Sequence, residues 1–353
     1  MLLFNVSLSY VVLALITFLF SLHCYADEPF QINKKALLPE NVAVIVNTLD
    51  ANSVEVGNYY IAARQIPKIN LIQVSLEKSR ATLNEAEFAL LKSDIDAKIT
   101  ANIDVIVLAW SSPYAVNCNS ITGAITLGYQ GALCQNTCSP SIQNPYFNSV
   151  SKSPFKDLNL RLSILLPTDS VDLAKAVIDR GVLSAFSVND ATGYFLKTTD
   201  KDRSKPREQF FPRDLFAIKA KKLFLRTLNK NSIKDKKDIM FYFTGVDSVP
   251  FLETLNFMPG AIADHLTSFG GILQNSPQMS SIKWLEAGAT GTYGTVSEPC
   301  NYWQKFPNPK VLLSHYLAGE TLVESYWKSV YWPSQGLFIG EPLAAPYNIN
   351  LNQ

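Results

Sequence analysis

Short apolar runs and amphipathic stretches alternate along the first part of the chain. Residues 41–47, 70–75 and 103–110 are mostly β-branched or apolar, as in strands that are buried on both faces. Between them, residues 53–65 and 82–100 carry apolar side chains at helical spacing. This alternation predicts a parallel α/β sheet.

The alternation returns after residue 160 and continues towards the C-terminus. A strand is expected at 160–166 and a helix at 170–181. Further strands are expected near Tyr194, at 239–243, near Ala261, at 290–296 and at 337–340. The predicted fold is a single α/β body, residues 27–353, with a mostly parallel sheet and helices on both faces.

Residues 105–151 interrupt this pattern and contain no charged side chain. They are rich in Ser, Asn, Gly and Pro, and Tyr114 is one of several aromatic residues among them. A long uncharged loop either packs without a ligand or offers amides and rings to a neutral ligand such as a peptide or glycan. We keep both interpretations, and Tyr114 is a candidate ligand-binding residue.

A second interruption, residues 200–238, is strongly basic. It holds 13 Lys or Arg and 6 Asp or Glu, a local charge of +7 in a chain whose net charge is +1. Leu215, Ile218, Leu225 and Leu228 fall on one face of a helix if this segment is helical. The segment is either a solvated helix with charged flanks or a surface for an anionic partner, such as an anionic cell-envelope surface.

Composition and the N-terminal segment restrict the class of protein. The chain is 47% hydrophobic, and its 31 basic residues nearly balance its 30 acidic ones, which excludes a disordered chain and gives no sign of a nucleic-acid partner. Residues 1–26 are uncharged and apolar, with small residues Cys24 and Ala26 placed as in a cleavage site. They predict a signal peptide and a periplasmic or extracellular protein; an uncleaved membrane anchor and a lipoprotein signal at Cys24 are the alternatives.

Four cysteines follow the predicted cleavage site. An even number in an oxidising compartment predicts two disulfides, and the expected pairs are Cys134 with Cys138 and Cys118 with Cys300. Zinc ligation by Cys134 and Cys138 is the alternative, but no histidine lies near them in the sequence. The sequence therefore predicts disulfides, with no metal and no cofactor.

Candidate catalytic residues are few, because only His265 and His315 follow the signal peptide. His265 lies where an expected strand opens into a loop, and Glu298 and Cys300 follow the next expected strand. Ends of parallel strands meet at one edge of a sheet, so His265 could act with Cys300 or with a carboxylate such as Glu298. His315 is expected on a helix that begins after Asn308, outside any site.

Other polar and aromatic residues near the same strand ends are candidate ligand contacts. They are Asp264, Ser268 and Tyr293. Asp264 precedes His265, so on a strand its side chain should point to the opposite face and should not orient the imidazole. The sequence contains no phosphate-binding loop, no dinucleotide-binding glycine motif, no nucleophile elbow and no His-Glu-x-x-His motif.

Several longer motifs resemble an uncharacterised, conserved hypothetical family of exported bacterial proteins. The motifs are WSSPYAVNC with SIT, IDRG, PGAIADHLTSFG, EAGATGTYGTVSEPCN and GLFIGEPLAAP, and they are spread over nearly all of the chain after residue 26. The resemblance implies export but no particular activity.

The last 120 residues or so also resemble gingipain-type cysteine peptidases, whose sheet is caspase-like. The closing motif of those enzymes is similar to Gly340-Glu341-Pro342. Their catalytic histidine corresponds to a position after residues 239–243, where this chain reads Thr244-Gly245, and His265 stands where their thiol would be. The resemblance implies a gingipain-like C-terminal half without the peptidase dyad.

Two functional hypotheses follow. The first is a non-catalytic exported protein, a pseudoenzyme on a peptidase-like scaffold, that binds a peptide or glycan near His265, Glu298 and the uncharged loop. The alternative is a hydrolase that uses His265 with Cys300 or with a nearby carboxylate.

Overall fold

The computed structural model describes residues 37–77, 79–184 and 190–348. The predicted signal peptide lies outside these residues. Among the described residues, no helix combines the length and the apolar character that a membrane span requires.

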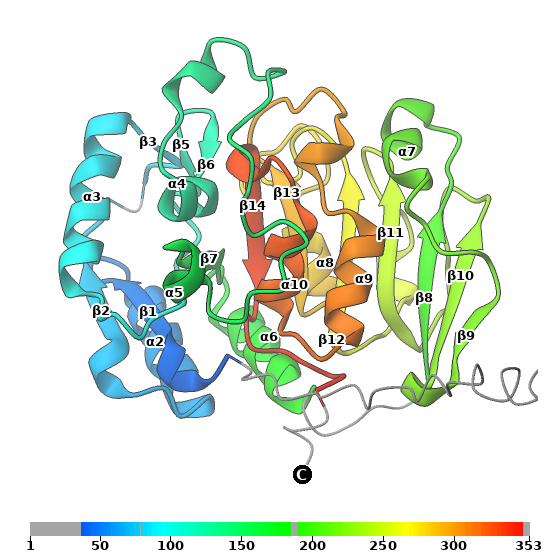
Figure 1. Cartoon of the computed structure of the whole chain (residues 1–353), viewed down its shortest axis with the longest axis horizontal. Coiled ribbons are helices and arrows are strands. Elements are labelled where there is room, and N and C mark those ends of the chain that lie inside the picture. Colours follow the sequence, from blue (N-terminus) through cyan, green and yellow to red (C-terminus); the bar gives the residue numbers. More distant parts are fainter. Residues whose placement is uncertain (1–36, 78, 185–189, 349–353) are drawn as a thin grey trace, which may run out of the picture. The chain divides into compact units, whose positions relative to one another are not determined.

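An eleven-stranded sheet forms the centre of the fold (Figure 1). Its order across the sheet is β2-β1-β4-β7-β14-β13-β12-β11-β8-β10-β9. The strands are β1 (Val42–Asn47), β2 (Leu71–Val74), β4 (Val105–Ala109), β7 (Leu162–Leu165), β8 (Ala191–Leu196), β9 (Phe216–Ile218), β10 (Leu223–Leu228), β11 (Ile239–Gly245), β12 (Phe257–Leu266), β13 (Gly291–Thr295) and β14 (Gly336–Gly340).

Most neighbouring strands are parallel, as the sequence predicts. In the order across the sheet, the neighbours β2, β1, β4 and β7 are parallel to one another. The neighbours β13, β12, β11, β8 and β10 are also parallel to one another. β14 is antiparallel to β13 and meets β7 at one residue pair, Ile339 with Leu165, while β9 is antiparallel to β10. In Figure 1 the arrow of β14 points against those of β13 to β10.

Helices cover both faces of the sheet. They are α2 (Ala51–Ala63), α3 (Glu85–Lys98), α4 (Ile121–Leu127), α5 (Pro154–Leu158), α6 (Val171–Leu183), α7 (Lys201–Glu208), α8 (Ile282–Ala287), α9 (Pro309–Leu317) and α10 (Leu322–Ser329). On β11, Phe241 contacts Tyr316 of α9, whereas the next residue, Tyr242, contacts Trp284 of α8. Successive side chains of a strand point to opposite faces, so α8 and α9 lie on opposite sides.

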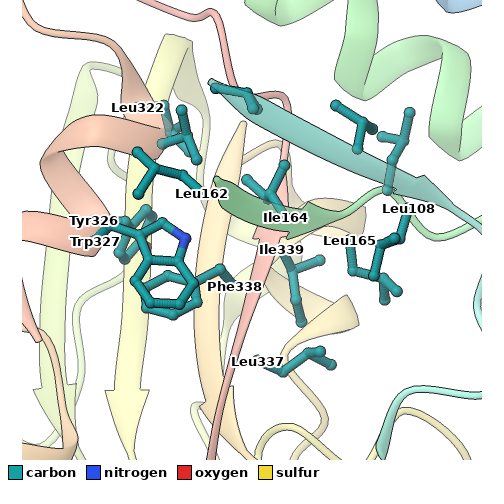
Figure 2. Close-up of a cluster of buried hydrophobic side chains, with 14 of the residues drawn as sticks. Leu108, Leu162, Ile164, Leu165, Leu322, Tyr326, Trp327, Leu337, Phe338 and Ile339 are labelled. Carbon is teal, nitrogen blue, oxygen red and sulfur yellow. The ribbon is translucent and has the colours of Figure 1, made fainter. Parts of the chain in front are cut away.

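Buried packing explains the continuous apolar strands. Every residue of β1 and β4 is buried. On the α9 side, Trp327 of α10 stacks on Phe338 of β14 with ring centroids 4.2 Å apart, and its indole N–H donates to the Ser163 carbonyl at 2.8 Å (Figure 2). The α/β class therefore follows from strands with both faces covered, as predicted.

The basic segment differs from its predicted structure. It forms the short helix α7 and then the strand pair β9–β10, so the helix that would align Leu215, Ile218, Leu225 and Leu228 is wrong. In β10, Leu223 and Leu225 are buried while Phe224 between them is exposed. That period of two is a strand pattern.

The long uncharged loop contains short elements of its own. Residues of the loop form β5 (Ala115–Val116), β6 (Asn119–Ser120) and α4, and β5 pairs with β3 (Thr82–Leu83) in a three-stranded sheet. Helix α4 packs on β7 and β14, and the Ser120 hydroxyl donates to the Gly336 carbonyl at 2.6 Å. Much of the loop is therefore a packed part of the fold.

Candidate functional site

Two hydrogen bonds join the loops that follow β12 and β13 to the segments that follow β4 and β7, at one edge of the sheet. Ser297, after β13, donates through its hydroxyl to the Cys118 carbonyl of the uncharged loop at 2.7 Å. Gln274, after β12, donates to the Asp169 carboxylate, which follows β7, at 3.1 Å. Helix α7 and the segments with α4, β5 and β6 lie at this edge, at the top of Figure 1.

His265 lies near the end of β12, and its side chain is fully enclosed. It is 1% exposed, and both ring nitrogens have partners. The indole N–H of Trp284 donates to Nδ1 at 3.0 Å, and Nε2 lies 3.1 Å from the Met279 carbonyl, to which it donates in the neutral tautomer that this pattern requires. Burial lowers the pKa of His265 to about 3. The imidazole is therefore neutral, and its acceptor lone pair is already used.

Asp264 points to the opposite face, as its place beside His265 predicts. It forms an ion pair with Arg207 of α7 (Nη1–Oδ1, 2.5 Å), and each of the two side chains is 1% exposed. Arg207 also donates to the Thr244 carbonyl at 2.7 Å. Burial raises the pKa of Asp264 to about 6, and the charge of Arg207 opposes that rise. This pair joins α7 to the strands beneath it.

Close backbone contacts fill the edge at β11 and β12. A Cβ on Gly245, the last residue of β11, would lie 2.2 Å from the Arg203 carbonyl oxygen of α7. A Cβ on Gly271 would lie 2.4 Å from the Gly294 carbonyl oxygen of β13. Real side chains do not approach backbone atoms so closely, so both positions require glycine. The place after β11 is thus occupied by α7.

The other predicted ligand contacts are also buried. Tyr293 is 1% exposed, and its hydroxyl donates to the Lys305 carbonyl at 2.6 Å. Ser268 is 7% exposed, and its carbonyl accepts from Thr295 Oγ1 at 2.8 Å. Tyr114 is 6% exposed in the turn after β4. None of these three positions presents an open side chain.

Cys300 and Glu298 lie in the loop after β13. A Glu298 oxygen accepts the backbone N–H of Cys300 at 2.7 Å, which supports a turn in which Cys300 and Asn301 both have positive φ. Cys300 forms a disulfide with Cys138. In this structure its sulfur is therefore bonded, and Glu298 shapes the loop.

The disulfides pair differently from the sequence expectation. Cys118 bonds to Cys134, and Cys138 bonds to Cys300, with Cα atoms 5.3 and 5.2 Å apart. Both predicted pairings, Cys134 with Cys138 and Cys118 with Cys300, are therefore wrong. The docking of the loop decides the pairs. The Lys305 ammonium, whose pKa burial lowers to about 8, donates to the Thr137 carbonyl and holds residue 138 beside the loop after β13. No cluster of metal-binding side chains occurs in the described residues.

An open groove lies at the same edge, between α7 and the loop after β13. Its volume is about 570 Å³, within the range of ligand pockets. Its lining residues are Lys201, Asp202, Lys205, Pro206, Gln209, Asn301, Tyr302, Trp303 and Gln304. We call it the aromatic groove, because Tyr302 and Trp303 belong to it and Tyr302 is 46% exposed.

Further rings support the wall of the aromatic groove. The Trp303 ring contacts Phe210 at a centroid distance of 5.0 Å, Tyr331 at 6.4 Å and Phe147 of the uncharged loop at 6.5 Å. The Tyr302 ring contacts Trp332 at 6.2 Å. This network joins the segment after α7, the uncharged loop and the segment before β14, so the wall is held from three sides.

Polar atoms without partners lie in the loop after β13 and in the segment before β14. Among the described residues, Asn301 Oδ1, Gln304 Oε1 and Trp332 Nε1 are buried and have no hydrogen-bond partner. Buried polar groups are normally paired, so such a group calls for an explanation such as a water or a ligand. Three of them beside one groove mark this region as the candidate binding site.

The aromatic groove is not among the sites that the sequence predicts. Tyr302-Trp303 follows Cys300 after one residue, Asn301, and Tyr331-Trp332 is a second aromatic pair shortly before β14. Two adjacent aromatic pairs on loops were the available signal. The predicted residues His265 and Asp264 lie beneath the edge instead, and Arg203 Nε, which donates to Thr267 Oγ1 at 3.3 Å, connects that layer to α7.

Comparison with known proteins adds little to this picture. No protein-family model and no curated protein matches the sequence, so the resemblance to a family of exported proteins stays a prediction. A solved structure described as "Structure of Protease" aligns at a TM-score of 0.49 and 10% identity, covering 89% of this chain and 80% of that one. Similarity at this level carries no functional conclusion; the α/β class rests on the sheet itself.

Proposed function

We propose that this chain is a non-catalytic exported protein that binds a glycan in the aromatic groove, on a scaffold similar to that of the gingipain-type peptidases. The observation that carries the proposal is the groove of about 570 Å³ with Tyr302 and Trp303 in its wall. Aromatic rings offer flat apolar faces, and the C–H faces of sugar rings stack on such surfaces. The amides of Gln209, Asn301 and Gln304 supply hydrogen-bonding groups for hydroxyls.

A glycan fits this surface better than a peptide does. The neighbouring residues 105–151 are uncharged, and Phe147 from that segment supports Trp303. A peptide that extends along a protein is often held by a free strand edge. Here the groove is bounded by a helix and a loop, so side-chain stacking and amide contacts dominate.

The geometry of the candidate dyad counts against the hydrolase alternative. A general base needs a free lone pair, but Nδ1 of His265 accepts from Trp284 and the ring is 1% exposed. A thiol nucleophile needs a free sulfur, but Cys300 is bonded to Cys138. Glu298 is committed to the N–H of Cys300.

Export is supported by the cysteines. Both pairs form disulfides, and structural disulfides persist in oxidising compartments. Together with the predicted signal peptide, they favour a periplasmic or extracellular location, or anchoring by an uncleaved N-terminal segment. The same location would bring the aromatic groove into contact with glycans of the cell envelope.

Glycan binding is tested by titration calorimetry with neutral oligosaccharides and, in parallel, with uncharged peptides. Tyr302→Ala is the informative variant, because the ring is 46% exposed and its loss should leave the fold intact. Its control is Phe216→Ala, which removes a ring that is 53% exposed on β9, outside the groove. We expect the first variant to bind an oligosaccharide about tenfold more weakly and the second to bind like the wild type.

Each other outcome overturns part of the proposal. Binding of peptides but no oligosaccharide would replace the ligand class. Equal affinities for Tyr302→Ala and the wild type would remove the aromatic groove as the site. A Cys300 that alkylates without reductant in the natively exported protein would reopen the hydrolase alternative.

A further inference from the structure

A second pocket is lined by residues of β8, of β10 and of the loop that follows β10. Its volume is about 490 Å³. Four cationic side chains and two rings belong to its lining: Arg226, Lys230, Lys234, Lys236, Tyr194 and Phe251. We call it the cationic pocket. It shares no lining residue with the aromatic groove.

The fold holds these cations around one hollow. Arg226 lies on β10, and the three lysines lie on the loop between β10 and β11. Ile233 of that loop is 4% exposed and packs in a cluster with Tyr194 and Tyr242, so the middle of the loop is anchored to the sheet. The Lys236 carbonyl accepts the backbone N–H of Asn256 at 2.7 Å, which fixes the end of the loop.

Positive charge exceeds negative charge at this pocket. Arg226 pairs with Asp214 (Nε–Oδ1, 3.0 Å), whereas Lys230, Lys234 and Lys236 have no ion-pair partner among the described residues. Asp238, whose carboxylate accepts from the Thr192 hydroxyl, lies near Tyr194 and sets one negative charge against those of the three lysines. Asp235 lies between two of the lysines in sequence but does not line the pocket.

Charge at this density in a hollow attracts anions. Like charges that converge without counter-ions repel one another, and an anion with several oxygens removes that repulsion while accepting charge-assisted hydrogen bonds. The two rings give the pocket an apolar part beside the charged one. A pocket of about 490 Å³ has room for a small organic ligand in addition to its charged group.

We propose that the cationic pocket binds a multiply charged oxyanion, a phosphate ester whose organic part lies against Tyr194 and Phe251. The proposal is independent of glycan binding in the aromatic groove. It makes the hypothesis of an anionic partner for residues 200–238 more specific, because it names one pocket and one class of ligand.

Titration calorimetry with inorganic pyrophosphate and with a phosphorylated sugar tests the proposal. The test variant is Lys234→Gln with Lys236→Gln. The matched control is Lys219→Gln with Lys222→Gln, which removes two charges from the same basic segment outside the pocket. We expect the test variant to bind at least about tenfold more weakly and the control to stay within about twofold, with affinity falling as salt rises.

Three results would overturn it: no binding by the wild type, equal losses in the two variants, or binding only to vesicles that contain an anionic phospholipid. Equal losses would mean a diffuse charge effect, and binding to vesicles alone would mean a membrane surface. Circular dichroism confirms that both variants are folded. Oligosaccharide binding in the aromatic groove, measured in the same variants, separates failure of this proposal from failure of the proposed function.

Discussion

At the residue scale, the environment of His265 decides what the side chain can do. A histidine at the end of a strand reads as a candidate base, but its surroundings are an indole N–H, a backbone carbonyl and apolar atoms. Burial favours the neutral ring, and the indole N–H occupies its acceptor nitrogen. His265 therefore acts as a polar core residue that joins β12 to Trp284 of α8.

Removal of the imidazole should destabilise the fold in a pH-dependent way. His265→Ala leaves the Trp284 N–H and the Met279 carbonyl unpaired and opens a cavity, a loss of about 3 kcal/mol near neutral pH. The folded-state pKa is about 3 and the ordinary value is 6.5, so the unfolded state binds the proton first. The wild type should therefore lose stability as the pH falls from 6.5 towards 3, and the variant should lack this loss.

Chemical denaturation above pH 6.5 and again between pH 3 and 6.5 measures both effects. The gap in the free energy of unfolding between wild type and variant should narrow at the lower pH. A gap that does not change with pH would contradict the neutral, buried imidazole.

At the element scale, a charged cluster fastens the end of the uncharged segment to α9 and α10. Glu320 is 5% exposed and accepts from Lys328 of α10 at 2.8 Å, from His315 of α9 at 3.1 Å and from Lys152. Lys328 also donates to the Ser151 carbonyl at 2.9 Å. Although burial alone would raise it, the pKa of Glu320 falls to about 2, because His315 and Lys328 favour the carboxylate.

Glu320→Gln should therefore cost about 3 kcal/mol, since it leaves the buried Lys328 ammonium without its partner. The control is Glu286→Gln, in an exposed pair with Lys283, where we expect less than about 1 kcal/mol. Because the folded pKa lies below the ordinary value of 4.5, the contribution of Glu320 is complete above pH 4.5 and is lost as the pH falls towards 2.

Urea denaturation of the two variants and the wild type, above pH 4.5 and below it, gives the comparison. If Glu320→Gln and Glu286→Gln lowered the free energy of unfolding by similar amounts, the charged cluster would not fasten the loop.

At the scale of the whole molecule, two disulfides connect parts of the chain that are far apart. Cys138 and Cys300 are separated by 162 residues, and their bond ties the uncharged segment to the loop that forms one wall of the aromatic groove. Cys118 and Cys134 are separated by 16 residues and close a loop within the segment. The first bond therefore supports the proposed binding site directly.

The longer crosslink should contribute more to stability. Loop-closure entropy gives about 5 kcal/mol for a separation of 162 residues and about 3 kcal/mol for 16. Paired serine replacements of Cys138 with Cys300, and of Cys118 with Cys134, should rank in that order in denaturation experiments. Peptide mapping after alkylation without reductant should recover these two linkages, and a linkage of Cys134 to Cys138 would refute the pairing.

Several elements could be predicted because their signals are local. The buried runs of β1 and β4 are visible in the sequence, and the Asn308 cap and Pro309 mark the start of α9, where the Asn308 side chain accepts from Lys310 and Val311. The helix predicted for the basic segment was wrong because two periodic patterns overlap there. Its leucines fit a helical face, yet the alternation in β10 has a period of two, and pairing with β8 selects the strand.

Four features follow from the amino-acid sequence alone: the α/β class, the course of most strands, the opposed directions of Asp264 and His265, and the positions of the uncharged and basic segments. These depend on the order of apolar and polar residues over short stretches. The folded arrangement of the chain sets the remaining features: the disulfide pairs, the antiparallel pairing of β14 with β13, the burial of His265, the aromatic groove and the cationic pocket. Each of these depends on which distant segments pack together, and that follows from the packing of the whole sheet and its helices rather than from any local pattern.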